Sequence, residues 1–231
     1  MQRRGVQIAI AACVAVATIL VYELYSLRPR PSVKEISDAQ DKVYEAVVRD
    51  LIAPPHGQPE ITQLVFGAAL LTSGADPESC KADVKQFLHV GASPLPFNSV
   101  ADKMYRFITR GGDDYFVRPD AVQSFSDRYC AGGRLSETFR TDLPRTFVNP
   151  QAVYFGIVPP RKNGPIPFKQ LFPGAPGIIS FSGVSFDSRL SQAVVFTTFE
   201  CGMLCGSGHI YVLQQTREGW RVTDKWLVWV S

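Results

Sequence analysis

The residues whose types and spacing could do chemistry lie in the stretch CGMLCGSGHIYVL, from Cys201 to Leu213. His209 follows four positions after Cys205, which in turn follows four positions after Cys201. Two thiolates and an imidazole could be three ligands of a zinc site. The same thiols could instead form a local disulfide, because a short turn can bring two Cβ atoms within the roughly 3.5–4.5 Å that the bond requires. A third interpretation is a pair of inert thiols in a tight turn.

The sequence favours the disulfide between Cys201 and Cys205 over the zinc site. No second cysteine pair lies close in sequence, and His56 and His89 are the only other histidines. A redox-active pair is typically Cys-x-x-Cys at a helix N-terminus, whereas this pair is expected between two strands. We therefore predict no metal and no cofactor, and we keep His209 as the one functional candidate of the stretch.

Cys80 and Cys130 form a second candidate disulfide. Leaving Cys13 aside, the chain has an even number of cysteines, which is compatible with two disulfides in an oxidising compartment. A bond from Cys80 to Cys130 would tie two expected helices together. The alternative is two buried thiols that act as small hydrophobic side chains. The cysteine usage favours an exported domain.

No catalytic motif accompanies these residues. The chain lacks Gly-x-Ser-x-Gly, His-Glu-x-x-His, a P-loop and a dinucleotide fingerprint. Asp113 and Asp114 could bind a cation, but adjacent acids after two glycines are more typical of a solvated turn. Trp220, Trp226 and Trp229 could line an aromatic pocket, but strand spacing favours core and cross-strand packing. The catalytic residues, if there are any, stay unassigned.

An apolar N-terminal segment precedes everything else. Residues 6–27 contain Glu23 as their only charge, and about 20 apolar residues cross a bilayer core as a helix. The segment is apolar all round, unlike the single stripe of a helix in a soluble core. We favour an uncleaved signal anchor. Two alternatives are a signal peptide cleaved after Ala15-Val16-Ala17 and a lipoprotein signal at Cys13.

Charge and cysteine usage set the expected location. Arg3 and Arg4 favour a cytoplasmic N-terminus, although Arg28 and Arg30 lie on the other flank. We predict residues 1–30 as an anchor in the bacterial inner membrane and residues 31–231 as a single extracytoplasmic domain.

Beyond the anchor, the chain carries no net charge. Without the four flanking arginines and Glu23, the remaining chain has 20 basic and 20 acidic residues. A neutral domain lacks the basic footprint that neutralises phosphates, so we predict no nucleic-acid partner. The expected partners are the membrane, through residues 6–27, and an envelope protein.

The domain is expected to have an α+β fold. Residues 33–52 have an amphipathic pattern that includes Val33, Val43 and Val47, and Ser32 with Glu35 forms a capping-box pattern. The last sixty residues are rich in β-branched and aromatic side chains and predict an antiparallel meander. Its four strands are expected at 177–187, 191–200, 209–216 and 220–231, with turns at 187–190 and 217–219. The apolar stripe of the helix is free to cover one face of this sheet.

The middle of the chain gives weaker signals. They predict a buried strand within 60–73, helices over 76–88 and 120–130, one strand after Arg145 and a helical turn near 168–172. Asp120 is expected to cap the second of these helices.

The C-terminal residues resemble the signature of a bacterial family that has no known activity. The resemblance is carried by a Gly-Ile opening, a Ser-x-Val-x-Phe strand, a Gln-Ala pair, a Gly-x-Leu-x-Gly-x-Gly turn, a Gly, Trp and Val strand and a final Trp-x-Ser. Here these are Gly177-Ile178, Ser182–Phe186, Gln192-Ala193, Gly202–Gly208, Gly219–Val222 and Trp229–Ser231. The resemblance implies an exported bacterial α+β domain. It also implies that the glycine pattern, and not the cysteines, is the family feature.

Two functions follow from these patterns. We predict a membrane-anchored extracytoplasmic domain that binds a ligand or protein partner without catalysis. The alternative is a cell-envelope hydrolase or transferase, with His209 or the Asp113-Asp114 pair in a cleft on a curved sheet.

Overall fold

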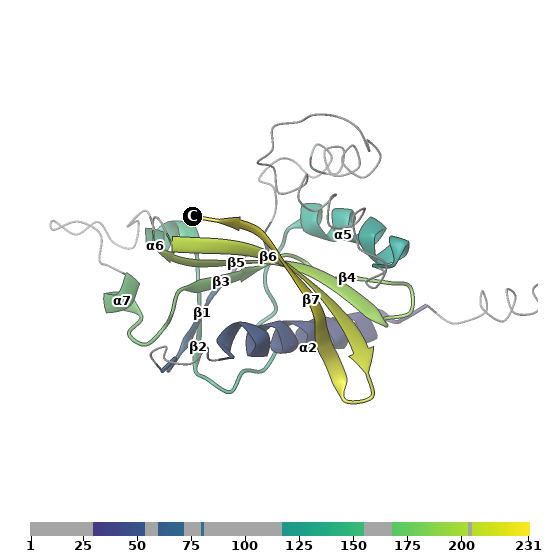
Figure 1. The fold of residues 1–231 in the computed structure, drawn as a ribbon, viewed down its shortest axis with the longest axis horizontal. Coiled ribbons are helices and arrows are strands. Elements are labelled where there is room, and N and C mark those ends of the chain that lie inside the picture. The colour runs from purple at the N-terminus through teal and green to yellow at the C-terminus, as the bar shows by residue number, and fades with distance from the viewer. Residues whose placement is uncertain (1–29, 54–59, 72–79, 81–116, 155–167, 203–204) are drawn as a thin grey trace, which may run out of the picture. The chain divides into compact units, whose positions relative to one another are not determined.

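The computed structural model describes residues 30–53, 60–71, 80, 117–154, 168–202 and 205–231 (Figure 1). The chain divides into two units, Met1–Ser32 and Val33–Ser231. The predicted anchor over residues 6–27, the Asp113-Asp114 pair and all of the expected helix over 76–88 except Cys80 lie outside the described residues. None of the described helices is long and apolar enough to cross a membrane. The anchor therefore stays a prediction from sequence.

Helix α2 spans Val33–Ile52, the range that the sequence predicts. Its buried side chains begin at Ala39 and include Val43 and Val47 of the predicted stripe. The prediction was wrong for Val33, which is 86% exposed because the buried part of the helix begins only at Ala39. The rest of α2 covers one face of the sheet, as expected.

The sheet has the strand order β2-β1-β3-β5-β6-β7, and β4 also pairs with β5. The strands are β1 Leu64–Gly67, β2 Arg145–Val148, β3 Ile178–Phe181, β4 Ser185–Phe186, β5 Gln192–Gly202, β6 Cys205–Thr216 and β7 Gly219–Val230. β3, β5, β6 and β7 form the predicted antiparallel meander. The fold is therefore α+β with a mostly antiparallel C-terminal sheet.

The first predicted strand of the meander is split into β3 and β4. Both segments pair antiparallel with β5. Between them, Ser182 accepts a hydrogen bond from the Phe196 amide through its side chain, at 2.9 Å. At Gly183 a Cβ would lie 2.9 Å from the carbonyl oxygen of Arg128, so only glycine allows this close approach. The break admits a helix, α5, to the sheet.

Two further strands extend the sheet in a way that the sequence did not predict. β1 pairs parallel with both β2 and β3. β1 is also much shorter than the segment 60–73 in which it was expected. Short helices α6 (Pro150–Tyr154) and α7 (Phe168–Leu171) complete the fold, and α7 lies where a helical turn was expected.

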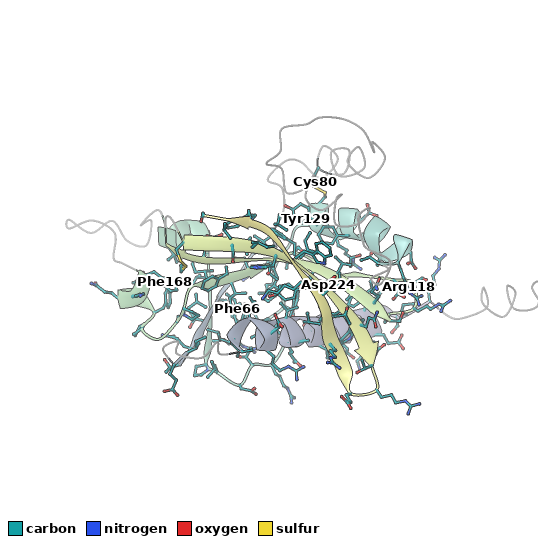
Figure 2. All side chains as sticks on the ribbon, viewed as in Figure 1. Phe66, Cys80, Arg118, Tyr129, Phe168 and Asp224 are labelled. Atoms are coloured by element: carbon teal, nitrogen blue, oxygen red, sulfur yellow. A yellow bond between two sulfur atoms is a disulfide. The ribbon has the colours of Figure 1, made fainter. Side chains whose placement is uncertain are left out.

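Helix α5 spans Pro119–Ala131 and covers the face opposite α2 (Figure 1). Side chains alternate along the strands, so Val195 packs in the cluster below α2 whereas Val194 and Phe196 pack below α5. Figure 2 shows Tyr129 of α5 beside the sheet, where its ring lies 6.3 Å from that of Phe196.

Polar contacts hold the first turn of α5 to the turn between β4 and β5. The prediction that Asp120 caps the helix was wrong, because Arg118 occupies the N-cap position without a side-chain cap. Asp120 instead accepts a hydrogen bond from the Ser188 amide at 2.8 Å. The buried Asp187 carboxylate lies 3.2 Å from the Arg118 guanidinium and accepts hydrogen bonds from the backbone and hydroxyl of Ser191.

Candidate functional site

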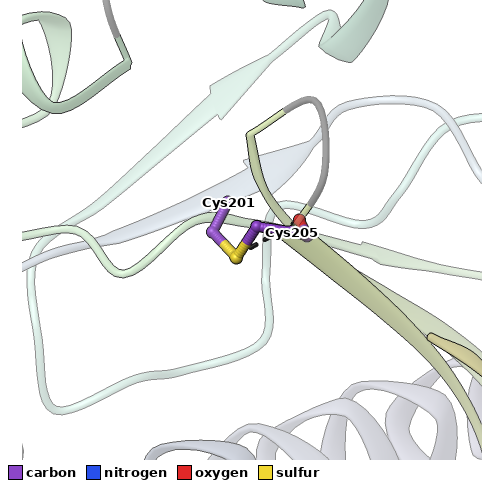
Figure 3. Close-up of a disulfide and its surroundings, with 2 residues drawn as sticks. All are labelled: Cys201 and Cys205. Atoms are coloured by element: carbon purple, nitrogen blue, oxygen red, sulfur yellow. Dashed lines mark hydrogen bonds between the residues drawn. A yellow bond between two sulfur atoms is a disulfide. The ribbon is translucent and has the colours of Figure 1, made fainter. Parts of the chain in front are cut away.

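The described part of the stretch Cys201–Leu213 forms the end of β5 and most of β6. The structure joins Cys201 to Cys205 between these two strands, with 5.1 Å between their Cα atoms (Figure 3). It also joins Cys80 to Cys130 of α5, with 5.6 Å between Cα atoms. Thiols that are bonded to each other are not free to act as zinc ligands.

His209 lies too far from the disulfide to act with it. Four residues separate Cys205 from His209 along β6, which is about 13 Å at the rise of a β-strand. Within the described ranges, no three His, Cys, Asp or Glu side chains gather in a group that could hold a metal ion. Cys201, Cys205 and His209 therefore do not form one site, because the two cysteines form the disulfide and His209 lies further along β6.

The glycines of the stretch do not all act as turn residues. Glycines permit both a positive φ and a close approach of other groups. Gly202 has a φ of +156°, whereas Gly206 and Gly208 have no positive φ and serve close approach instead. Both lie in β6 beneath the indole of Trp229 on β7. A Cβ at Gly208 would lie 2.2 Å from the Trp229 Nε1 atom, and a Cβ at Gly206 would lie 3.1 Å from its ring. The Gly-x-Gly pattern and the Trp-x-Ser end thus form one packing unit.

The indoles do not form one aromatic pocket. Trp220 packs in the cluster on the α2 face, with its ring 5.6 Å from that of Phe186. Trp226 and Trp229 pack against the cluster on the α5 face. The three tryptophans are therefore core and cross-strand packing residues, as their strand spacing favours.

His209 belongs to a polar cluster on the α2 face. Tyr211 is its neighbour on the same face of β6, with 6.2 Å between the ring centroids. Lys225 of β7 pairs with Tyr211, and its ammonium lies 5.0 Å from the centre of the tyrosine ring. The same ammonium forms an ion pair of 3.2 Å with Asp50 of α2. The cluster thus joins α2 to the edge strand β7.

The environment of the cluster sets the charge of its members. Burial lowers the pKa of His209, and the Lys225 ammonium lowers it further, while Asp50 acts in the opposite direction. Burial also raises the pKa of Tyr211 well above its usual range, and the Asp50 carboxylate adds to the effect. At neutral pH the imidazole is therefore uncharged and the phenol protonated.

Two polar atoms of the cluster are buried without a hydrogen-bond partner. The Tyr211 hydroxyl and the His209 Nδ1 atom find no partner of good geometry in the part of the chain that the structure describes. Tyr211 as a whole has no exposed surface. A phenol and an imidazole in this state offer hydrogen bonds, and the charged groups beside them are the Lys225 ammonium and the Asp50 carboxylate, which are paired with each other.

A groove opens next to the cluster, between the C-terminal half of α2 and the β6–β7 hairpin. It has a volume of about 570 Å³. Its lining residues are Ala46, Arg49, Asp50, Thr216, Glu218, Gly219, Trp220, Arg221 and Val222. Asp50 belongs to both the groove and the cluster. The groove thus combines open volume with charged side chains.

The sequence analysis found His209 but missed the charged residues around it. Strand pairing outward from the predicted turn at 217–219 would bring Asp224 opposite Tyr211, and a register shift between Val212 and Leu213 places Lys225 there instead, so the sequence could not have placed Lys225. Arg49 and Asp50 gave no signal, because exposed charges at the edge of an amphipathic helix are ordinary. Asp113 and Asp114, the other sequence candidates, lie outside the described residues.

With this geometry established, the chain can be set beside other proteins. It matches no protein-family model, no curated protein and no solved structure. The molecule is thus defined by its own geometry, an α+β domain with a groove between a long helix and a β-hairpin. Every assignment of a role to its residues rests on that geometry.

Proposed function

We propose that this chain is a membrane-anchored, extracytoplasmic binding module, which holds a segment of an envelope protein in the groove between α2 and the β6–β7 hairpin. The groove itself carries the proposal. Apolar side chains of Ala46 and Val222 lie in the same hollow as the charged side chains of Arg49, Glu218 and Arg221. An apolar surface edged with a few polar groups is typical of a binding site.

The location rests on two observations of different kinds. Residues 6–27 are apolar enough to cross a bilayer. Four cysteines of the domain are placed as two bonded pairs, which suits an oxidising compartment such as the periplasm. An alkaline phosphatase fusion at the C-terminus should be active, and an inactive fusion would contradict export. N-terminal sequencing of the mature chain separates an anchor from a cleaved or lipidated signal.

Binding is favoured over catalysis because two of the four titratable groups beside the groove have polar atoms that are shielded from solvent, although the side chains of Asp50 and Lys225 are each 36% exposed. Tyr211 is fully buried, and the His209 Nδ1 atom is also shielded from solvent. A general acid or base must reach the proton that it transfers. The envelope hydrolase or transferase is kept as a second candidate because four titratable side chains meet at Asp50, His209, Tyr211 and Lys225.

Site-specific photo-crosslinking in living cells tests the binding function. A benzoylphenylalanine at Glu218 lies in the groove, whereas the same group at Lys169 lies on the exposed α7 helix. We expect a discrete adduct from position 218, mapped by mass spectrometry to one segment of an envelope protein, and no such adduct from position 169. Equal labelling from both positions, or none from position 218, would contradict a groove that binds a partner.

A further inference from the structure

The charges of the groove indicate what kind of segment it binds. We infer, on the basis of the proposed binding function, that the occupant is an acidic protein segment whose carboxylates pair with Arg49 and Arg221. The inference concerns the chemistry of the occupant and goes beyond the existence of the groove.

Ion pairing leaves the groove with an excess of positive charge. Lys225 lies 3.2 Å from Asp50 and neutralises it. Arg49, Arg221 and Glu218 form no ion pair with any residue in the described ranges. Two guanidinium groups and one carboxylate are thus left to act on a ligand, and the balance favours an anionic one.

The two arginines come from opposite walls of the groove. Arg49 belongs to the last turn of α2, and Arg221 belongs to the start of β7. Guanidinium groups bind carboxylates with two parallel hydrogen bonds, which makes arginine more selective than lysine for this purpose. A chain that runs between the walls can be contacted by both residues.

The groove also offers apolar surface. Trp220 lines it and is only 6% exposed, with its Nε1–H buried away from an occupant. Ala46 and Val222 add apolar contact. The groove therefore suits a segment that combines apolar side chains with carboxylates, while Glu218 disfavours acidic residues near the hairpin turn.

An anionic membrane surface shares the negative charge of such a segment but not its shape. A hollow between a helix and a hairpin encloses an extended chain, whereas a flat bilayer surface meets only the groove rim. We therefore commit to a peptide, and binding to lipid becomes an outcome of the test.

The test measures binding by the full-length chain in a nonionic detergent. The probe is a fluorescein-labelled peptide in which glutamate and leucine alternate, and the readout is fluorescence anisotropy. We expect Arg49→Gln and Arg221→Gln each to weaken binding about tenfold, which corresponds to about 1.4 kcal/mol, since each variant loses a charge-assisted hydrogen bond to the peptide. Arg217→Gln, in the same hairpin but outside the groove, should leave binding unchanged, and added salt should weaken binding by the wild type.

The remaining outcomes separate the two proposals. If a glutamine–leucine peptide binds as tightly as the acidic peptide, the inference fails, while a crosslink from position 218 still supports a binding module. If neither peptide binds and the crosslink is absent, both proposals fail. If phosphatidylglycerol vesicles bind in a manner that depends on Arg49 and Arg221 while the acidic peptide does not, the groove is a lipid-binding site and the inference is overturned.

Discussion

The two faces of the sheet hold their helices by different physical means. Beneath α2, the rings of Tyr44, Phe66, Phe139 and Phe181 lie against one another, with Tyr44 and Phe181 centred 4.7 Å apart. Beneath α5 the apolar cluster is smaller, and the helix is joined to the sheet by directional bonds. The larger aromatic cluster lies beneath α2, whose polar contacts include the 3.0 Å hydrogen bond from the Tyr44 hydroxyl to the Ser182 carbonyl and the Lys225–Asp50 ion pair, whereas α5 relies more on polar and covalent contacts.

The bonds that fix α5 come from both ends of the helix. Near its start, Arg118 forms an ion pair with Asp187. In its second turn, Ser124 hydrogen-bonds to Ser185 and to the Phe186 carbonyl. Near its end, Cys130 is bonded to Cys80. Packing has no preferred direction, whereas these contacts hold α5 at defined points along its length.

The largest effect should come from removing a ring beneath α2. We expect Phe181→Ala to lower the free energy of unfolding by about 3–5 kcal/mol, because a fully buried ring is lost and a cavity remains. Urea denaturation followed by tryptophan fluorescence measures the change. Val33→Ala is the matched control on α2 itself, and it should have no measurable effect because Val33 is 86% exposed. A loss below about 1 kcal/mol for Phe181→Ala would show that packing does not dominate this face.

The disulfide at the end of α5 should be next in size. We expect the Cys80→Ala/Cys130→Ala double variant to lose about 2–4 kcal/mol, since the bond closes a loop of 50 residues in the unfolded chain. The Cys201→Ala/Cys205→Ala variant is the control. Its bond closes a loop of only four residues, and on chain entropy its loss should be about 2 kcal/mol smaller. Equal losses in the two double variants would show that loop entropy does not set their contribution.

A third change breaks the polar contacts of α5 without touching its apolar cluster. Asp187→Ala should cost about 2–3 kcal/mol, because it leaves Arg118 and the amides of Ser191 and Gln192 without their acceptor. Ser191→Ala keeps both amide bonds and removes only the hydrogen bond from the Ser191 hydroxyl to Asp187, so it should cost about 1 kcal/mol. Hydrogen exchange locates the effect, with faster exchange expected in α5 and unchanged exchange in α2. Faster exchange in both helices would mean that the two faces are not independent.

The difference between the faces also explains what the sequence could predict. The α2 helix and the turn at Arg217–Gly219 depend on local patterns, and both were predicted within a residue or two. Gly219 has a φ of +118°, as a hairpin turn of this kind requires. Parallel pairing of β1 with β2 and β3 joins segments far apart in sequence, so no local pattern indicated it.

The candidate site was predicted only in part, for a related reason. His209 was found because an isolated histidine beside two cysteines is conspicuous in a sequence. Its partners Asp50 and Lys225 come from the two ends of the domain and meet only through the tertiary fold. The polar contacts of Asp187 were missed because an aspartate in a turn looks like turn chemistry alone.

The smallest expected effect concerns the polar end of the α2 face and depends on pH. Because burial holds the pKa of His209 below its unfolded value, the unfolded chain binds a proton more readily than the folded one. The contribution of neutral His209 to the free energy of unfolding is therefore fully present above the unfolded pKa of about 6.5. It is lost as the pH falls from there toward the folded pKa. His209 is partly open to solvent, so after allowance for screening the loss should stay below about 1 kcal/mol.

Urea denaturation of the wild type and of His209→Gln at about pH 7.5 and about pH 5.5 isolates this contribution. The wild type should lose more stability on acidification than the variant, because glutamine does not titrate and the other groups are common to both. An equal loss in both chains would place the acid sensitivity elsewhere. The stability of the α2 face would then be no more sensitive to acid near His209 than near its aromatic cluster. The His209 cluster would have no role that depends on protonation of the imidazole.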